Sequence, residues 1–192
     1  MATGRIQALT DGVYAIAMTI LILNLHVPQV PHRGPDLINA LWRLSTFFMD
    51  FVISFLLLAI FWVVHHLHFH HIKRADRKLL WINLLSLLFV VLIPFTTSVY
   101  GEYRELTVAA AFFEANILVL GLIKCAQWSY ATSKHLLVDP DLDQAIIDEN
   151  KRVGLVTPVV ALIAIGVAFV APDWSTSTFL LIPLVIRGVR RL

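Results

Sequence analysis

The sequence predicts an all-α polytopic membrane protein, and three observations lead to that fold class. Of the 192 residues, 58% are hydrophobic and the mean hydropathy is +0.78, which is too apolar for a water-soluble domain. Several runs reach the roughly 20 mostly apolar residues that a membrane-spanning helix needs. The roughly ten-residue alternation of transmembrane β-strands is absent from the sequence.

We expect six spanning helices in a single domain that comprises residues 1–192. The predicted helices cover about residues 9–27, 37–66, 79–100, 106–130, 153–171 and 175–190. The first ends at Pro28, where a loop rich in helix breakers begins. The second is long enough to project from the bilayer or to tilt. The last has a short apolar part, so it must use flanking residues, thin the bilayer locally or lie at a protein interface.

The segments between the helices and the single cysteine carry further information about the fold. Residues 65–78 are rich in histidine and basic residues and are expected to form a polar connection. Residues 133–151 form the longest soluble piece, with a short amphipathic helix. Cys125 lies in an apolar run, which excludes a disulfide framework and a cysteine-based metal site. Polar residues in the first apolar run argue against a cleaved signal peptide.

The placement of the basic residues predicts the orientation in the membrane. Of the 15 Lys and Arg residues, all but Arg33, Arg43 and Arg104 fall on one side of the six-span layout. An excess of Lys and Arg marks the cytoplasmic side, so both termini are predicted to be cytoplasmic, in a cell membrane. Lys124 is expected to snorkel to that edge. The net charge of +2 argues against nucleic-acid binding.

The first apolar run keeps Asp11, Thr19 and Asn24 among leucines and isoleucines. Each polar group costs free energy in hydrocarbon unless it finds a partner, so a simple lipid anchor has no reason to keep them. At about 100° per residue the run carries two stripes. One stripe consists of Gly12, Ile16, Thr19 and Leu23, and the opposite one of Asp11, Met18, Ile22 and Leu25.

We interpret the stripe that contains Ile16 as the lining of a pore. Around an axis shared by several copies, Ile16 forms a hydrophobic constriction of the kind that gates by dewetting, and Thr19 forms a hydroxyl ring one turn outward. The alternative is that small and branched residues of this stripe simply pack against neighbouring helices of a bundle.

Three motifs resemble the TMEM175 potassium channel family. Arg5 and the run Leu9-Thr-Asp-Gly-Val-Tyr-Ala-Ile16 are similar to its signature Arg-x-x-x-Phe-Ser-Asp-Gly-Val-Phe-Ala-Ile. Similar motifs in later helices are Trp62-Val-Val-His65 and the run from Asn83 to Pro94-Phe95. Leu9 and Thr10 depart from the signature: Thr10 keeps a hydroxyl group, whereas Leu9 loses an aromatic contact.

The resemblance implies a potassium-selective pore without a re-entrant filter loop, formed by a homotetramer of the prokaryotic, single-repeat type. Its partners are potassium ions, the lipid bilayer and further copies of the chain, with no cofactor and no catalysed reaction. Ile16 becomes the narrowest ring and carries selectivity, with Thr19 and Leu23 as further pore rings. The resemblance also implies a network between helices that supports the pore. Its residues are Arg5, Thr10, Asp11, Gly12, Trp62, His65 and Asn83.

Two other interpretations stay open at the level of sequence. A proton-coupled or cation secondary transporter could use Asp11, Asp50, Glu114 and the histidines, although no convincing repeat relates the two halves of the chain. A third class is a histidine-rich metal-binding or assembly protein that transports nothing. The histidines concerned, either as metal ligands or as groups titrating near neutral pH, are His65, His66, His68, His70 and His71.

Overall fold

The computed structural model describes residues 3–29 and 34–190, and this part of the chain confirms the predicted all-helical fold class. The expected loop residues around Arg33, and the terminal Arg191, lie outside the described residues. The α-helices are α1 (Gly4–Ile20), α2 (Gly34–His71), α3 (Arg77–Glu102), α4 (Thr107–Thr132), α5 (Gln144–Ala168), α6 (Pro172–Ser175) and α7 (Ile182–Val189). Three-residue-per-turn 3-10 segments cover Leu21–Asn24, Ser133–His135 and Thr176–Leu181.

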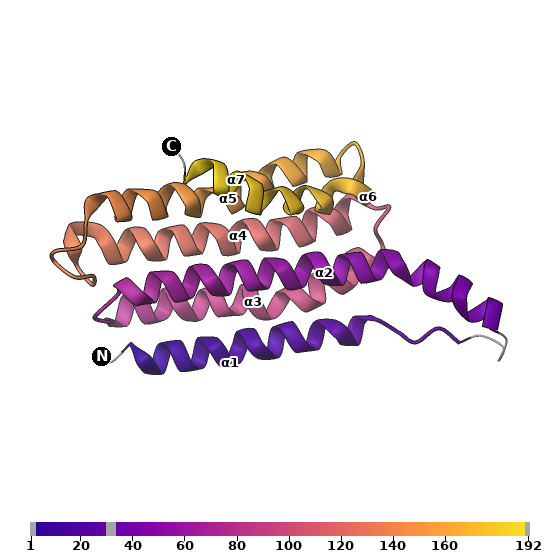
Figure 1. Ribbon diagram of the computed structural model, residues 1–192, viewed down its shortest axis with the longest axis horizontal. Coiled ribbons are helices and arrows are strands. Elements are labelled where there is room, and N and C mark those ends of the chain that lie inside the picture. Colours follow the sequence, from indigo (N-terminus) through magenta and orange to yellow (C-terminus); the bar gives the residue numbers. More distant parts are fainter. Residues whose placement is uncertain (1–2, 30–33, 191–192) are drawn as a thin grey trace.

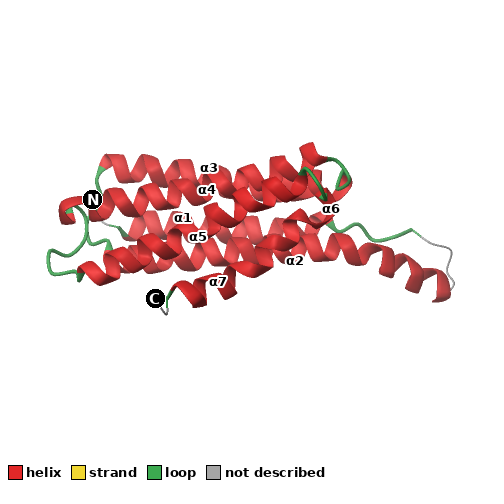
Figure 2. Ribbon diagram, turned by 90° about the horizontal axis from the view of Figure 1, so that it is seen from above, coloured by secondary structure: helices red, strands yellow, loops and turns green. Residues whose placement is uncertain are grey.

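The long helices lie side by side in an elongated bundle (Figure 1). α1 lies at one edge, α2 and α3 come next, then α4, and α5 with α7 forms the opposite edge. Figure 2 shows α2 extending well beyond the other helices at one end of the bundle. The second helix is thus long, as expected, and it extends past its neighbours.

Five helices of the described chain are long and apolar enough to cross a membrane. They are Gly4–Asn24, Asp36–His71, Arg77–Glu102, Thr107–His135 and Gln144–Ala168. The sixth helix, expected over residues 175–190, is not among these five. The segment is helical without a gap from α6 through Thr176–Leu181 to α7, but its middle is 3-10 rather than α-helix.

Local hydrogen bonds and a proline explain why the middle of this segment is 3-10 rather than α-helix. Ser175 Oγ donates a hydrogen bond to Pro172 O at 2.9 Å, and Thr178 Oγ1 donates to Ser175 O at 2.7 Å. Such hydroxyls compete with the regular helical ladder. Pro183 lacks an N–H donor at the point where α7 begins. The segment still turns back along α5, and Arg190 Nε lies 3.6 Å from Glu149 Oε1 near the start of that helix (Figure 1).

Several predicted boundaries move because side chains cap or extend the helices. α3 begins at Arg77 because Asp76 accepts a hydrogen bond from the Leu79 amide at 2.8 Å, as an N-cap residue does. Asp143 caps α5 in the same way through the Ala145 amide at 2.9 Å. The amphipathic helix expected before residue 153 is therefore the first part of α5 rather than a separate element.

The expected polar connection over residues 65–78 is mostly helix, since α2 continues to His71. Burial of one face against α4 explains this difference: the ring of His68 stacks on that of Trp128, with centroids 4.5 Å apart. The short loop that remains is tied down by the Lys73 amide, which donates to Leu137 O at 2.9 Å. The loops after α2 and α4 therefore form one compact end of the bundle, called the basic end below.

The main hydrophobic core lies between α2, α3, α4 and α5. α4 and α5 approach closely at Gly121, where an added Cβ would lie 2.9 Å from Pro158 Cγ. α1 contributes Tyr14 and Ala17 to this core from its edge position, and its 3-10 continuation Leu21–Asn24 contributes Leu21. The edge position of α1 matters for the site described next.

Candidate functional site

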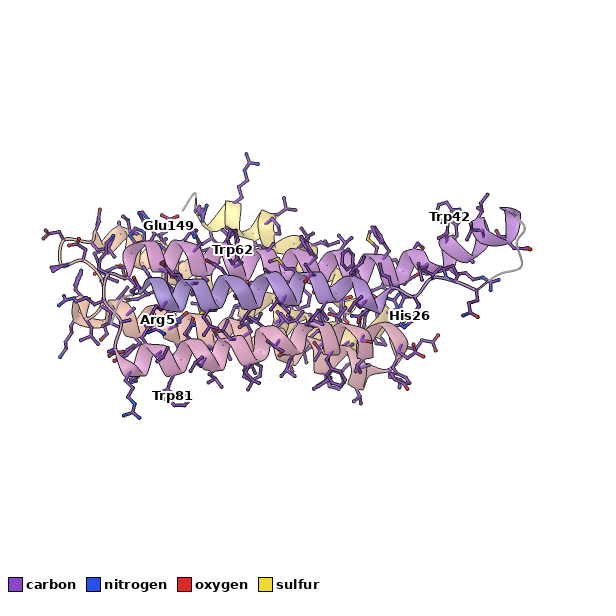
Figure 3. All side chains as sticks on the ribbon, turned by 90° about the horizontal axis from the view of Figure 1, so that it is seen from below. Arg5, His26, Trp42, Trp62, Trp81 and Glu149 are labelled. Atoms are coloured by element: carbon purple, nitrogen blue, oxygen red, sulfur yellow. The ribbon has the colours of Figure 1, made fainter. Side chains whose placement is uncertain are left out.

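α1 buries one face and leaves the stripe predicted to line a pore uncovered within the chain. Ile16 is 60% exposed and Leu23 is 70% exposed, although both are large apolar residues. Thr19 and Gly12 on the same stripe are exposed as well, and a Cβ added to Gly12 would meet no atom within 4 Å. Figure 3 shows α1 at the surface, flanked by α2 and α3. Most of the surface of this stripe is thus uncovered by the described chain, and Ile16 also lines a pocket with Val91 and Phe95 of α3.

The face of α1 that packs against the bundle differs from the one predicted. Its fully buried residues recur at spacings of four, three and four: Thr10, Tyr14, Ala17 and Leu21. These lie opposite the stripe of Ile16, whereas the stripe of Asp11 runs along one flank and includes the exposed Ile22. Spacing alone groups residues on a face but does not determine which face meets α2 and α3.

The Thr19 hydroxyl is held in a defined orientation. Its Oγ1 donates to the backbone oxygens of Ile16 at 2.9 Å and Ala15 at 3.0 Å. A hydroxyl has one proton to donate and two lone pairs that accept. Because the proton points back to the helix, the oxygen lone pairs remain available on the exposed side.

A buried series of hydrogen bonds connects α1 to three other helices. Asn83 Nδ2 donates to Thr10 Oγ1 at 3.0 Å, and Gln127 Nε2 donates to Asn83 Oδ1 at 3.2 Å. Lys124 Nζ lies 3.5 Å from Gln127 Oε1 and 3.4 Å from His65 Nδ1. The series runs from α1 through α3 and α4 to α2, and all its members are buried.

A second contact joins α1 to α2 outside this series, where Trp62 Nε1 donates to Asp11 Oδ1 at 2.9 Å. Among the residues predicted to form the support network, four are thus joined in pairs: Thr10 with Asn83, and Asp11 with Trp62. His65 joins the same series through Lys124. Arg5 is exposed and makes no hydrogen bond or ion pair with the described chain; Figure 3 shows it at the same end as Trp62.

Sequence reasoning missed Gln127 and assigned Lys124 wrongly. Lys124 does not snorkel, because it is only 3% exposed and lies inside the bundle. Their spacing could have indicated a buried polar pair, because Lys124 and Gln127 are three residues apart and share one face of an apolar helix. Polar residues at such positions are expensive unless they are partnered, and this pair finds its partners in α2 and α3.

The other polar groups inside the helices lie at separate places. Both carboxylate oxygens of Asp50 accept from Arg104 Nη2 at 2.8 Å, which ties α2 to the loop after α3. Glu114 is fully buried in α4. Asn24 Nδ2 donates to Pro94 O at 3.0 Å, so the third polar residue of the first apolar run has its partner.

The histidines of α2 point in different directions. His65 and His68 are buried, whereas His66 and His70 are exposed. Within residues 3–29 and 34–190, no three His, Cys, Asp or Glu side chains are grouped so that they could share a metal ion.

The fold and the site define a multi-pass helical membrane protein with a patterned helix at its edge. Comparison with known proteins agrees: the sequence profile of the family described as "Endosomal/lysosomal potassium channel TMEM175" matches residues 5–94. A potassium channel of Streptomyces collinus (strain DSM 40733 / Tue 365) is 38% identical over 145 residues, which cover 73% of this chain and 70% of the relative. The chain belongs to the TMEM175 family, a family of ion channels rather than of enzymes.

Two further comparisons concern a solved structure and an animal protein. The crystal structure of a lysosomal potassium-selective channel TMEM175 homologue from Chamaesiphon minutus matches with a TM-score of 0.83 and 28% identity, covering 97% of both chains. The human endosomal/lysosomal proton channel TMEM175 is 30% identical over 138 residues, which cover 66% of this chain and 27% of the human protein. The predicted resemblance to this family is confirmed.

Proposed function

We propose that this protein is a potassium-selective channel that conducts passively through a pore lined by α1. The pore lies on the axis of a homotetramer in the cell membrane. The observation that carries the proposal is the uncovered stripe of α1 with Ile16, Thr19 and Leu23. A lipid-facing stripe needs neither a glycine nor an oriented hydroxyl, whereas a stripe that faces identical stripes around an axis can use both.

Ile16 is the proposed constriction, and Thr19 and Leu23 form the next rings. A dry, narrow ring of branched side chains forces an ion to shed much of its hydration, which costs potassium less than the more strongly hydrated sodium. The oriented lone pairs of Thr19 favour cations beside that ring. Selectivity for potassium thus follows from narrowness, and selectivity for cations from the hydroxyl group.

The contacts behind α1 have the proposed role of supporting the pore. Thr10, Asp11, Trp62, Asn83 and His65 hold the helix through the hydrogen bonds described above. We assign Arg5 and Gly12, which have no partner within the described chain, to contacts between copies.

The proposed topology is a single six-pass domain with both termini in the cytoplasm. The segment over residues 172–189 is the sixth crossing, and its return along α5 supports this assignment. It also brings Arg187 and Arg190 back to the basic end, which agrees with the excess of basic residues expected on the cytoplasmic side.

Flux of potassium and of sodium into liposomes that contain the purified protein tests the proposal, with Ile16→Asn as the variant. We expect faster potassium than sodium flux for the wild type and a ratio close to one for the variant. The matched control is Ile163→Asn, because Ile163 on α5 is 55% exposed and is outside the proposed pore. Selectivity that survives in Ile16→Asn would contradict the assignment.

The alternative is a proton-coupled or cation secondary transporter. Asp11, Asp50 and Glu114 have separate surroundings, which disfavours a relay between them. Flux coupled in a fixed ratio to a second ion would favour the carrier, and fast potassium flux without a coupled ion would favour the channel.

A further inference from the structure

A cavity of about 180 Å³ lies between α2, α4, α5 and α7 on the side of α4 that faces away from α1. Its polar lining residues are Lys124, His68, Ser129, Asn150, Lys151 and Thr157, and Cys125 lies among them. Lys124 lies eight residues before the end of α4, about 12 Å from the basic end at a rise of about 1.5 Å per residue. The cavity is therefore near one membrane surface.

The buried cation in the lining of this cavity, Lys124, has no negatively charged partner in the described chain. Lys124 Nζ has three protons and only two neutral acceptors, at 3.4 and 3.5 Å. No carboxylate of the described chain pairs with it. His68 Nδ1 is buried and has no hydrogen-bond partner in the same part of the chain. Burial disfavours the charged ammonium of Lys124 unless a counter-charge compensates it, so an anion bound in this cavity would stabilise the charged form.

Two acidic residues that neighbour this lining in the sequence are paired with exposed basic side chains. Asp148 Oδ1 lies 3.7 Å from Lys151 Nζ, and Glu149 pairs with Arg190 at 3.6 Å. All four side chains are about half exposed. Exposed pairs of this kind contribute little to stability, so they do not prevent Lys151 and Arg190 from contacting an incoming anion.

An apolar groove of about 400 Å³ continues from the cavity along the surface between α2 and α7. The two spaces share four lining residues, Ile60, Val64, Val153 and Ile186. On α2 the groove extends from Ile53 to Leu67, which is about 21 Å at the helical rise. That length exceeds the roughly 15 Å half-thickness of the hydrocarbon core, so an acyl chain fits along it.

We propose that the cavity and the groove together bind one anionic phospholipid. Its phosphate contacts Lys124, Lys151 and His68, and one acyl chain lies in the groove between α2 and α7. A free phosphate ion would use the cavity but not the groove, whereas a zwitterionic lipid would use the groove without compensating the charge. The site goes beyond the proposed channel function and is tested without any measurement of ion flux.

Protection of Cys125 from a small maleimide is the test, because it is the single cysteine of the sequence and lines the cavity. The full chain in a neutral detergent is titrated with phosphatidylglycerol, phosphatidylcholine or inorganic phosphate. We expect phosphatidylglycerol to slow the labelling at concentrations where the other two have no effect. A cysteine at the exposed Ser133 in a Cys125→Ala background corrects for any effect of lipid charge on thiol reactivity.

Three variants locate the site. Lys124→Gln and Lys151→Gln should each weaken protection by about fivefold, since a basic residue near an anionic lipid contributes about 1 kcal/mol. Ile186→Trp fills the junction of cavity and groove without changing charge, and it keeps the test valid if Lys124→Gln fails to fold. Lys134→Gln is the matched control, because Lys134 is exposed in the loop after α4.

Three results would overturn the proposal. Equal protection by phosphatidylcholine would indicate an uncharged lipid groove, and equal protection by inorganic phosphate would indicate a simple anion site. Protection that depends on protein concentration and not on lipid would indicate that a second copy covers the groove.

Discussion

At the scale of single residues, the polar side chains of α1 have distinct positions. Thr10 is buried and accepts from Asn83, Asp11 accepts from Trp62 on the flank, and Thr19 is exposed with its proton turned inward. Each position satisfies the donors or acceptors that hydrocarbon would leave unpaired. The same polar residues that make α1 a poor lipid anchor thus hold it in one orientation.

Replacing Asp11 by alanine tests whether this orientation matters for assembly. The change removes the acceptor for Trp62 Nε1, and a hydrogen bond to a charged group contributes about 1.5–3 kcal/mol. We expect Asp11→Ala to lower both the assembled fraction, measured by size exclusion with light scattering, and potassium flux. Glu105→Ala, at an exposed loop position, is the control. Normal assembly together with normal flux would refute the supporting role.

At the scale of elements, helix ends are determined by residues that lie outside the apolar runs. Asp76 accepts from the Leu79 amide at 2.8 Å and also from the Tyr130 hydroxyl of α4. It therefore begins α3 and ties that beginning to the end of α4. Desolvation opposes ionisation of Asp76, but these hydrogen bonds outweigh it and hold the pKa of the carboxyl below its ordinary value.

The Asp76→Ala variant should have a lower apparent melting temperature in detergent than the wild type, since loss of an N-cap costs about 1 kcal/mol. A depressed pKa in the folded state means that the stabilisation is present above the unfolded pKa of 3.8 and is lost as the pH falls through the folded pKa. The difference between wild type and variant should therefore be full at neutral pH and shrink below pH 3.8. A constant difference down to that range would show that the ionised carboxylate is not the stabilising form.

A second tie between elements is the pair of Asp50 and Arg104 at the end opposite the basic end. Arg104→Leu leaves a buried carboxylate without its partner, which should destabilise the protein by about 2 kcal/mol. The double variant Asp50→Asn with Arg104→Leu should recover part of that loss, as measured by thermal unfolding in detergent. No recovery would mean that Arg104 acts through packing, such as its contact with the Tyr100 ring at 5.4 Å.

At the scale of the whole molecule, the edge position of α1 and the return of the last segment are the main features. The edge position leaves Ile16 and Leu23 available to other copies (Figure 3). The return along α5 places Arg190 beside Glu149, near the basic loops. Both features depend on contacts between residues far apart in the sequence.

Cysteine accessibility in intact cells tests the proposed topology. In a Cys125→Ala background, a cysteine at Glu105 should react with a membrane-impermeant maleimide from outside. Cysteines at Gly188 and Ser133 should react only after permeabilisation. Labelling of the Gly188 position in intact cells would mean that residues 172–189 do not cross the membrane.

Much of the fold could be predicted because hydropathy reports directly on the bilayer. Five of the expected helices are present as long apolar helices, with ends shifted by caps such as Asp76 and Asp143. The sixth was expected as a helix as well, but its 3-10 middle was not, because that depends on the local hydrogen bonds of Ser175 and Thr178 and on Pro183. The family motifs in α1 and α2 could also be recognised from the sequence, because each is a short run of neighbouring residues.

The sequence by itself determined the membrane class, the family and the periodic grouping of Ile16, Thr19 and Leu23 on one stripe of α1. Only the tertiary structure decided that Thr10 and Tyr14 face the bundle, that Lys124 is buried with Gln127 and His65, and that a cavity joins a groove behind it. Periodicity is a property of one helix and needs no neighbours. Which face is buried, and which polar groups meet, depends on how separate helices pack, and spacing along the chain does not contain that information.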